Sequence, residues 1–452
     1  KPSKLALVIL KVCSPGKPST FYFQDMLAPL PVPRLDTTLD AWLASVESCV
    51  TAEDYAVAKE AAEELRTVSG PALQRQLVAR SKVCTHRNWL DAWWQNVAYL
   101  RGRYPVVINS NTAAVDSFDL PPPAPQLRRA AGLSARALAF WRRVATEQML
   151  PTRVGGVVPI DMRAYGIMFG TTRIPQVEVD TLRYADPERN EEAAHIVVNY
   201  GSRMFVVEVA KGGHVKTQAQ LEASFRAVKS MAEGSMWEDP NVAALTTSDR
   251  TQWATARAEL LQDSSNQESL EAIETALFCV NLLEHGADSL TQSFRDTLYG
   301  DGRRVWQDKA LTFHVFADGH ASVSMEHAWA DAGPPSHLWE FMLATEEYPA
   351  SASQETCVAL PVALKWTVSP AMLDTIKRAR DDFEATARNT AVATLAHWAY
   401  GKDTIKQWKV SPDACFQQVI QVAGHRFYGK PMMTYESGST RAFFNGRTEC
   451  IR

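Results

Sequence analysis

The amino-acid sequence predicts an α/β (α+β) fold, because segments with helical periodicity and short strand-like runs alternate along the chain. Helical spacing comes first, from about Thr37 to Leu100, where Leu39, Leu43 and Val46 share one face. The stretch from Ala52 to Thr67 is rich in alanine, glutamate and leucine at the same spacing. Two later pairs of β-branched and aromatic runs predict β-hairpins.

The remaining elements follow from turn residues and periodicity. We expect a proline-rich connector at Asp119–Pro125, a helix at Arg129–Val144, and a hairpin with a Gly-Ser turn formed by Ile196–Tyr200 and Met204–Val209. An amphipathic helix is expected at Gln267–Leu283 and an irregular link at Glu347–Val368. From Pro370 onward the residues are expected to be mainly helical.

The second hairpin carries the most informative residue of the chain. Leu311–Phe316 and Ala321–Met325 are its strands, and Asp318-Gly319 supplies the positive φ angles of a tight turn. His327 then falls at a strand exit. After Gly333-Pro-Pro a helix from about His337 to Leu343 is expected, with Ser336 as its N-cap.

His327 has a carboxylate four positions further on, at Asp331. An imidazole near neutrality can take a proton from a hydroxyl group and return it, so this pattern is typical of a general base. The alternative is a half-buried histidine at a strand end, held only by hydrogen bonds.

Composition excludes several classes of protein. The chain has 452 residues, of which 46% are hydrophobic and 22% charged, so we expect at least two hydrophobic cores rather than disorder or a coiled coil. A net charge of −4 argues against a nucleic-acid partner, which would need a concentrated basic surface. No run of about 18 to 20 apolar residues is present, so no helix within this sequence is expected to cross a bilayer.

Seven cysteines are spread singly, without a Cys-x-x-Cys pair, and no His-x-x-x-His or His-Glu-x-x-His motif occurs. We therefore expect reduced, mostly buried thiols and no metal site. Because the sequence starts at Lys1 rather than at methionine, we interpret it as a piece of a longer chain. An anchor or targeting peptide would then lie outside it.

Three lysines gather near the C-terminal end. Lys402, Lys406 and Lys409 stand just before a helix that Ser411-Pro412-Asp413 is expected to cap. Such compact positive charge suits a phosphate group. The alternative is a solvated helix face.

Several blocks together resemble the carnitine/choline acyltransferase family. They are Leu30-Pro-Val-Pro-Arg-Leu35, Tyr104–Asn111, Leu245-Thr-Thr-Ser-Asp-Arg250, Arg304–Lys309, Glu326–Asp331, Ser411–Asp413, Thr434–Ser437 and Gly446-Arg-Thr448. The resemblance runs from about residue 27 to the last residue. It departs at Ala28-Pro29, where the family usually has Pro-Arg, and we expect this change to affect packing only.

Within the family, two groups of residues resemble the outer-membrane type of carnitine palmitoyltransferase. They are Ala328–Asp331 followed by Leu338-Trp-Glu340, and Trp93-Trp94 with Tyr99–Arg103. The resemblance implies two chloramphenicol-acetyltransferase-like domains with the active-site tunnel at their interface. Residues 1–95 would pack with the C-terminal domain, 96–367 would form the domain with the histidine, and 368–452 would be part of a C-terminal domain that continues further.

The resemblance also implies roles for particular residues. Lys402 and Lys406 would hold the 3′-phosphate of CoA, and Asp413 would lie beside the same nucleotide end. Tyr435 and Thr448 would donate hydrogen bonds to the carnitine carboxylate, and Arg447-Thr-Glu449 favours carnitine over choline. Without the resemblance, Tyr435 would be a packing residue and Thr448 the end of a strand.

His327 would be the general base, whereas Asp331 would pair with an arginine beyond residue 452 rather than directly with the histidine. The implied reaction is reversible transfer of an acyl group, expected to be long, between acyl-CoA and carnitine, with no cofactor apart from these substrates. The open alternatives are a short- or medium-chain carnitine or a choline acyltransferase, and a noncatalytic acyl-CoA sensor. The implied location is mitochondrial, at the outer membrane facing the cytosol, with any membrane association through segments outside this sequence.

Overall fold

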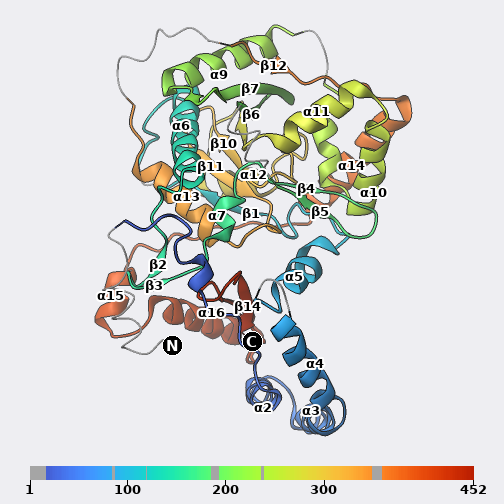
Figure 1. Cartoon of the computed structure of the whole chain (residues 1–452), viewed down its shortest axis with the longest axis vertical. Coiled ribbons are helices and arrows are strands. Elements are labelled where there is room, and N and C mark those ends of the chain that lie inside the picture. Colours follow the sequence, from blue (N-terminus) through green and yellow to red (C-terminus); the bar gives the residue numbers. More distant parts are fainter. Residues whose placement is uncertain are drawn as a thin grey trace. The chain divides into compact units, whose positions relative to one another are not determined.

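The computed structural model describes residues 17–83, 87–118, 120–184, 193–235, 239–348 and 359–451. The chain divides into two compact units (Figure 1). Unit 1 comprises residues 1–22, 92–153 and 162–393, and unit 2 comprises residues 23–91, 154–161 and 394–452. The predicted boundaries 1–95, 96–367 and 368–452, and the predicted tunnel, stay predictions.

A mixed β-sheet forms the centre of unit 1 and confirms the predicted α/β class. Its strand order is β1-β11-β10-β9-β6-β7-β12, and β8 pairs with β7. The strands are β1 (Thr112–Val115), β6 (Ala193–Tyr200), β7 (Arg203–Lys211), β8 (His214–Val215), β9 (Cys279–Leu282), β10 (Thr312–Val315), β11 (Ala321–Met325) and β12 (Val362–Ala363).

Both predicted hairpins are confirmed, but of the Asp318-Gly319 pair only Gly319 has the predicted positive φ. Gly201 and Ser202 join β6 to β7 with φ values of 59° and 74°. Gly319 joins β10 to β11 with φ 95°, and an added Cβ there would lie 2.3 Å from the carbonyl oxygen of Ala124. Only glycine fits this second turn without a shift of the backbone.

The predicted helix from Gln267 to Leu283 is wrong in its second half. Helix α11 (Ser264–Thr275) ends early, and β9 follows after three residues. β9 lies between β6 and β10, parallel to both, with all four residues buried. A strand covered on both faces has no alternation of polar and apolar residues, so its apolar run resembles a continuing helix.

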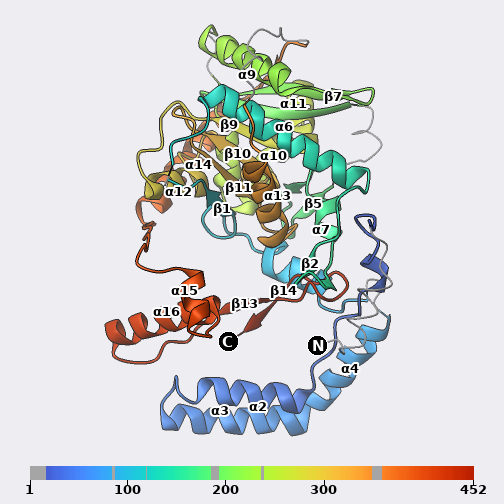
Figure 2. The ribbon, with the colours of Figure 1, turned by 90° about the vertical axis from the view of Figure 1, so that its left-hand side faces the viewer.

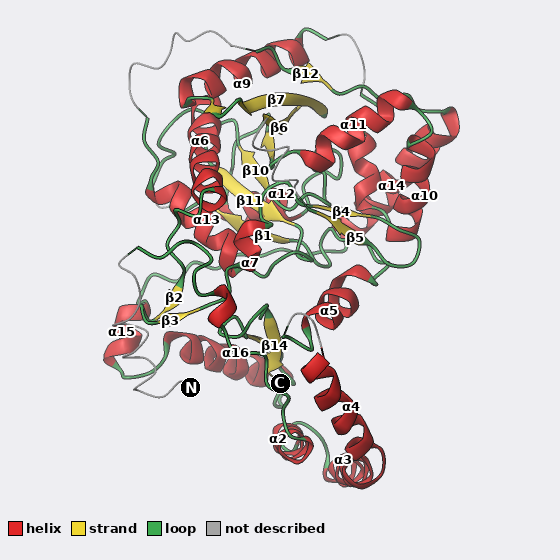
Figure 3. Ribbon diagram, viewed as in Figure 1, coloured by secondary structure: helices red, strands yellow, loops and turns green. Residues whose placement is uncertain are grey.

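Helices cover both faces of the sheet (Figure 3). They are α6 (Gln126–Ala145), α7 (Arg163–Gly166), α9 (Gln218–Glu233), α10 (Arg250–Leu260), α11, α12 (Leu290–Leu298), α13 (Gly333–Ala344) and α14 (Pro370–Arg388), with a 3₁₀ segment at Val242–Thr247. Ile196 and Val198 of β6 pack into the core with α6, α9 and α13, whereas Val197 packs into the core with α10, α11 and α14. This alternation of side chains along the strand separates the two cores.

Two expectations about loops near the sheet need correction. Helix α13 begins at Gly333, so Ser336 lies inside it and donates its backbone N–H to the carbonyl of Ala332 rather than capping the helix. Pro334 and Pro335 occupy the first turn, where a missing N–H costs nothing. The link from Glu347 to Val368 includes strand β12, and its residues 349–358 lie outside the described part.

Unit 2 contains helices from the two ends of the chain. The helices α2 (Leu35–Val46) and α3 (Ala52–Glu64) lie side by side (Figure 2), and α3 continues through a π-helical stretch, Leu65–Ser69, into α4 (Gly70–Val83). Thr51 caps α3 by accepting from the N–H of Asp54. The later part has α15 (Lys402–Gln407), α16 (Pro412–Tyr428) and the hairpin of β13 (Glu436–Ser439) and β14 (Thr448–Ile451).

Buried polar residues connect the segments of unit 2. Asp161 donates its backbone N–H to the carbonyl of Arg441 at 2.7 Å and accepts from the N–H of Asn445 at 2.8 Å. Asn88 donates to the carbonyl of Asn445 at 2.9 Å. These bonds join three segments that are far apart in the sequence. Across the described residues of both units, no helix is long and apolar enough to span a membrane.

Candidate active site

His327 lies in unit 1, two residues after the end of β11. Its side chain is 21% exposed, between the buried residues Glu326 and Ala328, so one side of the ring is accessible while the backbone around it is packed. The hairpin of β10 and β11 explains this position, because β11 is paired with β10 on one side and β1 on the other, and the chain leaves the sheet where β11 ends. The predicted strand-exit position of His327 is confirmed.

Asp331 lies close to His327 but outside normal hydrogen-bonding distance. The Nδ1 atom of His327 is 3.8 Å from an Oδ1 atom of Asp331, whereas a hydrogen bond between these groups would measure about 2.7 to 3.2 Å. The carboxylate is about as exposed as the imidazole, at 20%. It therefore adds negative potential near the ring without fixing the ring's orientation through a short bond.

An aromatic ring orients His327 instead. Tyr99 stacks on the imidazole with ring centroids 4.9 Å apart and an interplanar angle of 17°. Tyr99 belongs to a π-helical segment, Gln95–Leu100, that continues the short helix α5 (Asp91–Trp94), and Gln95 of the same segment donates to the carbonyl of Ala328 at 3.4 Å. No role of Tyr99 was predicted from the sequence, because the two stacked residues are far apart along the chain.

Behind this site runs a chain of buried ion pairs, which we call the ion-pair chain. Its members lie in five separate parts of unit 1: Arg173 on β4 (Thr172–Ile174), Asp180 before β5 (Thr181–Arg183), Arg250 at the start of α10, Asp308 before β10, and Glu326 after β11. The side chains are between 0% and 2% exposed. The N–O distances are 3.0 Å for Arg173–Glu326 and 2.7 Å for Arg173–Asp180, Arg250–Asp180 and Arg250–Asp308.

The ion-pair chain is hydrogen-bonded to the backbone of two segments, the loop of His327 and the segment of Tyr99. Glu326 accepts from the N–H of Ala328 at 2.8 Å, and Arg173 donates to the carbonyl of Tyr99 at 2.8 Å. The same guanidinium therefore fixes, through Glu326, the loop that carries His327 and the segment that carries its stacking partner. Such support from behind keeps a catalytic side chain in one geometry.

The charged groups of the ion-pair chain shift one another's pKa values. Burial alone raises the pKa of the Asp180 carboxyl, but the guanidinium groups of Arg250 and Arg173 outweigh it and hold this pKa below its usual value. Burial lowers the pKa of Arg173, and the carboxylates of Glu326 and Asp180 outweigh it in turn, so that this pKa is raised. Burial instead raises the pKa of the Asp308 carboxyl, although the guanidinium of Arg250 opposes this shift.

Lys309, which follows Asp308, is also buried and hydrogen-bonded. Its Nζ atom donates to the hydroxyl of Thr172 at 2.9 Å and to the carbonyl of Glu274 at 3.1 Å. Burial lowers the pKa of Lys309 to about 8. The Trp306-Gln-Asp-Lys309 block is thus buried in unit 1.

The residues predicted to bind CoA lie in unit 2. Lys402 and Lys406 are exposed and one helical turn apart on α15, and Asp413 is exposed in the first turn of α16. Ser411 caps α16 as predicted, with its hydroxyl accepting from the N–H of Ala414. The two lysines thus present positive charge on one side of a short helix.

The residues predicted to bind carnitine flank the terminal hairpin of unit 2. Tyr435 immediately precedes β13 and is 57% exposed, which excludes the simple packing role within the described residues. Thr448 begins β14 rather than ending a strand, is 8% exposed, and donates to the carbonyl of Gly438 at 3.2 Å. Their roles stay predictions, as do those of His327 and Asp331.

Among the described residues, no group of three or more histidine, cysteine or acidic side chains is arranged to hold a metal ion. Cys49, Cys279, Cys415 and Cys450 are free thiols. At His327 the structure places an imidazole next to a carboxylate and a tyrosine ring, and an imidazole can transfer a proton.

Comparison with known proteins supplies the class to which this fold and site belong. Residues 30–452 match the model of the choline/carnitine O-acyltransferase family. The chain belongs to this family.

Particular relatives show how far the similarity extends. The chain is 31% identical to the muscle isoform of carnitine O-palmitoyltransferase 1 of Sus scrofa and 30% identical to the liver isoform of Homo sapiens, over 100% of its own length and 59% and 60% of theirs. It is also 31% identical to the peroxisomal carnitine O-octanoyltransferase of Rattus norvegicus, over 96% of its own length and 72% of the relative. The chain thus spans about 60% of the length of the palmitoyltransferase relatives it matches.

Proposed function

We propose that the protein transfers an acyl group reversibly between CoA and the hydroxyl group of carnitine, with His327 as the general base. Family membership and the names of the relatives support acyl transfer to carnitine. The observation that carries the assignment of the base is the environment of His327: its ring is partly exposed and stacked on Tyr99, and its loop is anchored by Glu326.

In the proposed reaction, the imidazole of His327 takes the proton from the carnitine hydroxyl as its oxygen attacks the thioester carbonyl carbon. A tetrahedral oxyanion forms, stabilised by hydrogen-bond donors and by carnitine's own trimethylammonium group. The carbon–sulfur bond then breaks, and the CoA sulfur takes the proton from the imidazolium. In reverse, His327 deprotonates the CoA thiol. No covalent acyl-enzyme is required.

Residues near the C-terminal end of the sequence would bind the substrates. Lys402 and Lys406 would bind the 3′-phosphate of CoA, with Asp413 beside the nucleotide, because their exposed charges lie close together. Tyr435 and Thr448 would donate to the carnitine carboxylate. Asp331 would assist electrostatically, since its distance from His327 excludes a short hydrogen bond in this structure.

We infer that the acyl chain is long and that the protein is of the carnitine palmitoyltransferase kind, acting at the mitochondrial outer membrane. The sequence blocks at Ala328–Asp331 and Trp93-Trp94 and the names of the palmitoyltransferase relatives support this. A medium-chain enzyme is the second candidate, favoured by the similar identity to the peroxisomal octanoyltransferase, and it would move the proposed location to the peroxisome.

One assay tests the reaction and the base. The full-length protein is incubated with palmitoyl-CoA or octanoyl-CoA, and free thiol is followed with and without carnitine. We expect carnitine-dependent thiol release, faster with palmitoyl-CoA, and a loss of about 10²- to 10⁴-fold in His327→Ala. His214→Ala, which changes an exposed histidine on β8, is the matched control.

The outcomes separate the alternatives. Normal turnover in His327→Ala would rule out this base. Release with choline instead of carnitine would assign the other acceptor of the family. Tight binding of palmitoyl-CoA without release to either acceptor would identify a noncatalytic sensor.

A further inference from the structure

A concave site lies in unit 1, at the opposite end of the sheet from His327. It is a pocket of ≈ 760 Å³ that we call the arginine pocket; it is bounded by the end of β9, helix α12, the loop 299–305 and the last turn of α14. β6, β9 and β10 are parallel, and their carboxyl ends meet here, whereas the antiparallel β11 runs away from this end toward His327. Ligands of open α/β sheets commonly bind at the carboxyl ends of parallel strands.

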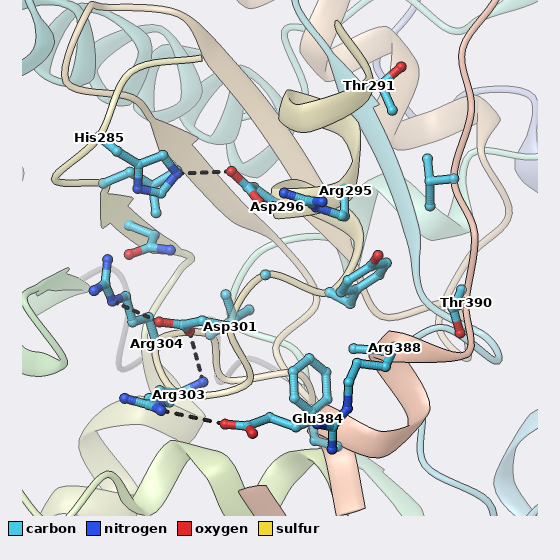
Figure 4. A pocket seen from close by; sticks show the side chains of 18 of the residues that line it. His285, Thr291, Arg295, Asp296, Asp301, Arg303, Arg304, Glu384, Arg388 and Thr390 are labelled. Carbon is cyan, nitrogen blue, oxygen red and sulfur yellow. Dashed lines mark hydrogen bonds and ion pairs between the residues drawn. The ribbon is translucent and has the colours of Figure 1, made fainter. Parts of the chain in front are cut away.

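Four arginines surround the pocket (Figure 4): Arg295, Arg303, Arg304 and Arg388. Three carboxylates share its lining, and each has a basic partner: Asp296 with His285 at 2.9 Å, Asp301 with Arg304 at 3.1 Å, and Glu384 with Arg303 at 3.6 Å. Arg388 has no ion-pair partner among the described residues. Arg304 also pairs with Glu284 at 3.1 Å, so the charge that remains available to an anion, among the described residues, is that of Arg388.

The loop that carries two of these arginines has little freedom. Gly302 has φ +67°, and an added Cβ would lie 2.3 Å from the ring of Phe383. Any other residue at this position would displace the ring and the adjacent Arg303 and Arg304. The geometry of the rim thus depends on a glycine packed against the wall of the pocket.

The inner part of the pocket combines aromatic rings with an amide. Tyr299 and Phe383 are each 4% exposed, with ring centroids 6.3 Å apart. Asn281 of β9 is 2% exposed and lines the pocket, and its Oδ1 atom has no hydrogen-bond partner among the described residues. A buried acceptor without a partner is costly, so a ligand that donates a hydrogen bond here would be favoured.

We propose that the arginine pocket binds a nucleoside monophosphate with adenine as its base. The phosphate would lie among the arginines, which suit phosphate oxygens in number and geometry. The base would pack against the aromatic wall and donate its amino group to the Oδ1 atom of Asn281, because the Nδ2 atom of this residue is already paired with His314. The volume is within the range of small-molecule sites. This inference goes beyond the proposed acyl transfer and does not depend on it.

Binding of adenosine monophosphate to the full-length protein, followed by isothermal titration calorimetry without carnitine or acyl-CoA, tests the proposal. Adenosine and ribose 5-phosphate each keep only half of the contacts, so we expect both to bind at least tenfold more weakly. Arg388→Gln should weaken the complex with adenosine monophosphate by about tenfold, because one charge-assisted contact is lost. Arg388 is exposed, so this change leaves the core intact.

Two control variants make the result specific. Arg378→Gln removes the same charge from an exposed position of α14 that does not line the pocket, and it should leave binding unchanged. The double variant Lys402→Ala, Lys406→Ala removes the proposed CoA-phosphate lysines and should also leave binding unchanged. No binding at millimolar concentration, equal binding in Arg388→Gln, or loss of binding in the double lysine variant would overturn the proposal.

Discussion

The two ends of the central sheet use charged residues in opposite ways. Behind His327, the members of the ion-pair chain are at most 2% exposed, and every link is between 2.7 Å and 3.0 Å. Around the arginine pocket, Arg304 is 23% exposed and pairs at 3.1 Å, whereas the side chains of Arg295 and Arg303 are 47% and 39% exposed, and their closest carboxylates lie at 3.8 Å and 3.6 Å. Buried, mutually satisfied charges position a neighbouring group, whereas exposed and loosely paired charges remain available to a ligand.

The largest expected effect comes from breaking the ion-pair chain. Arg173→Met removes the link between Glu326 and Asp180 and leaves both carboxylates buried with fewer partners. We expect a loss of about 3 to 5 kcal/mol in the free energy of unfolding, measured by urea denaturation. A change below about 1 kcal/mol would contradict the view that these charges hold the site.

A matched substitution on the surface sharpens this test. Arg226 pairs with Glu222 four residues earlier on α9, and its side chain is 42% exposed. Arg226→Met should cost no more than about 0.5 kcal/mol, because exposed helix pairs contribute little. The difference between the two variants measures the effect of burial on similar ion pairs.

Local signals in the sequence were sufficient to predict one hairpin and the position of His327, but not strand β9 or the start of helix α13. The Asp318-Gly319 turn and the alternating strands around it predicted the hairpin and the strand-exit position of His327. β9 was missed because a strand buried on both faces has no alternation to detect. The Ser336 cap was wrong because two prolines start α13 earlier.

The ion-pair chain could not be predicted from sequence. Arg173, Asp180, Arg250, Asp308 and Glu326 are spread over more than 150 residues, and only the folded sheet brings them together. Several of them lie within the blocks that carried the family resemblance, but a block of residues does not indicate which partner each side chain contacts. The stacking of Tyr99 on His327 was hidden for the same reason.

The next largest effect is expected from a buried histidine in the central sheet, which makes the unfolding free energy depend on pH. His314 on β10 is fully buried, lies 2.9 Å from the hydroxyl of Ser324, and burial lowers its pKa to about 3. Between pH 6.5 and 3 the unfolded chain binds the proton more readily, so this residue makes the folded state less stable as pH falls. We expect up to about 1.4 kcal/mol per pH unit in this range.

Comparison with His314→Gln isolates this contribution. The variant should show a flatter decrease in unfolding free energy between pH 6.5 and 4.5 than the unchanged protein. Asp239 acts in the opposite direction, since burial raises its pKa to about 6, and it is present in both proteins. Parallel curves for the two proteins would show that His314 is charged or exposed in the folded state.

A smaller effect is expected from the stacked ring at the active-site end. Tyr99→Ala should lower kcat for acyl transfer by about tenfold, since an aromatic stack contributes roughly 0.5 to 1.5 kcal/mol. Tyr99→Phe keeps the stacking and should keep kcat. If Tyr99→Phe lost as much activity as Tyr99→Ala, the hydroxyl group rather than the ring would be the functional part.

The smallest effect on stability is expected at the other end of the sheet. Arg388→Gln should change the unfolding free energy by less than about 0.5 kcal/mol and leave acyl transfer unchanged, because Arg388 is exposed and has no ion-pair partner among the described residues. Thermal unfolding and the thiol assay measure both quantities. A large loss of stability would place Arg388 in the framework of unit 1 and remove the contrast between the two ends, since the arginine would then be a structural residue rather than one available to a ligand.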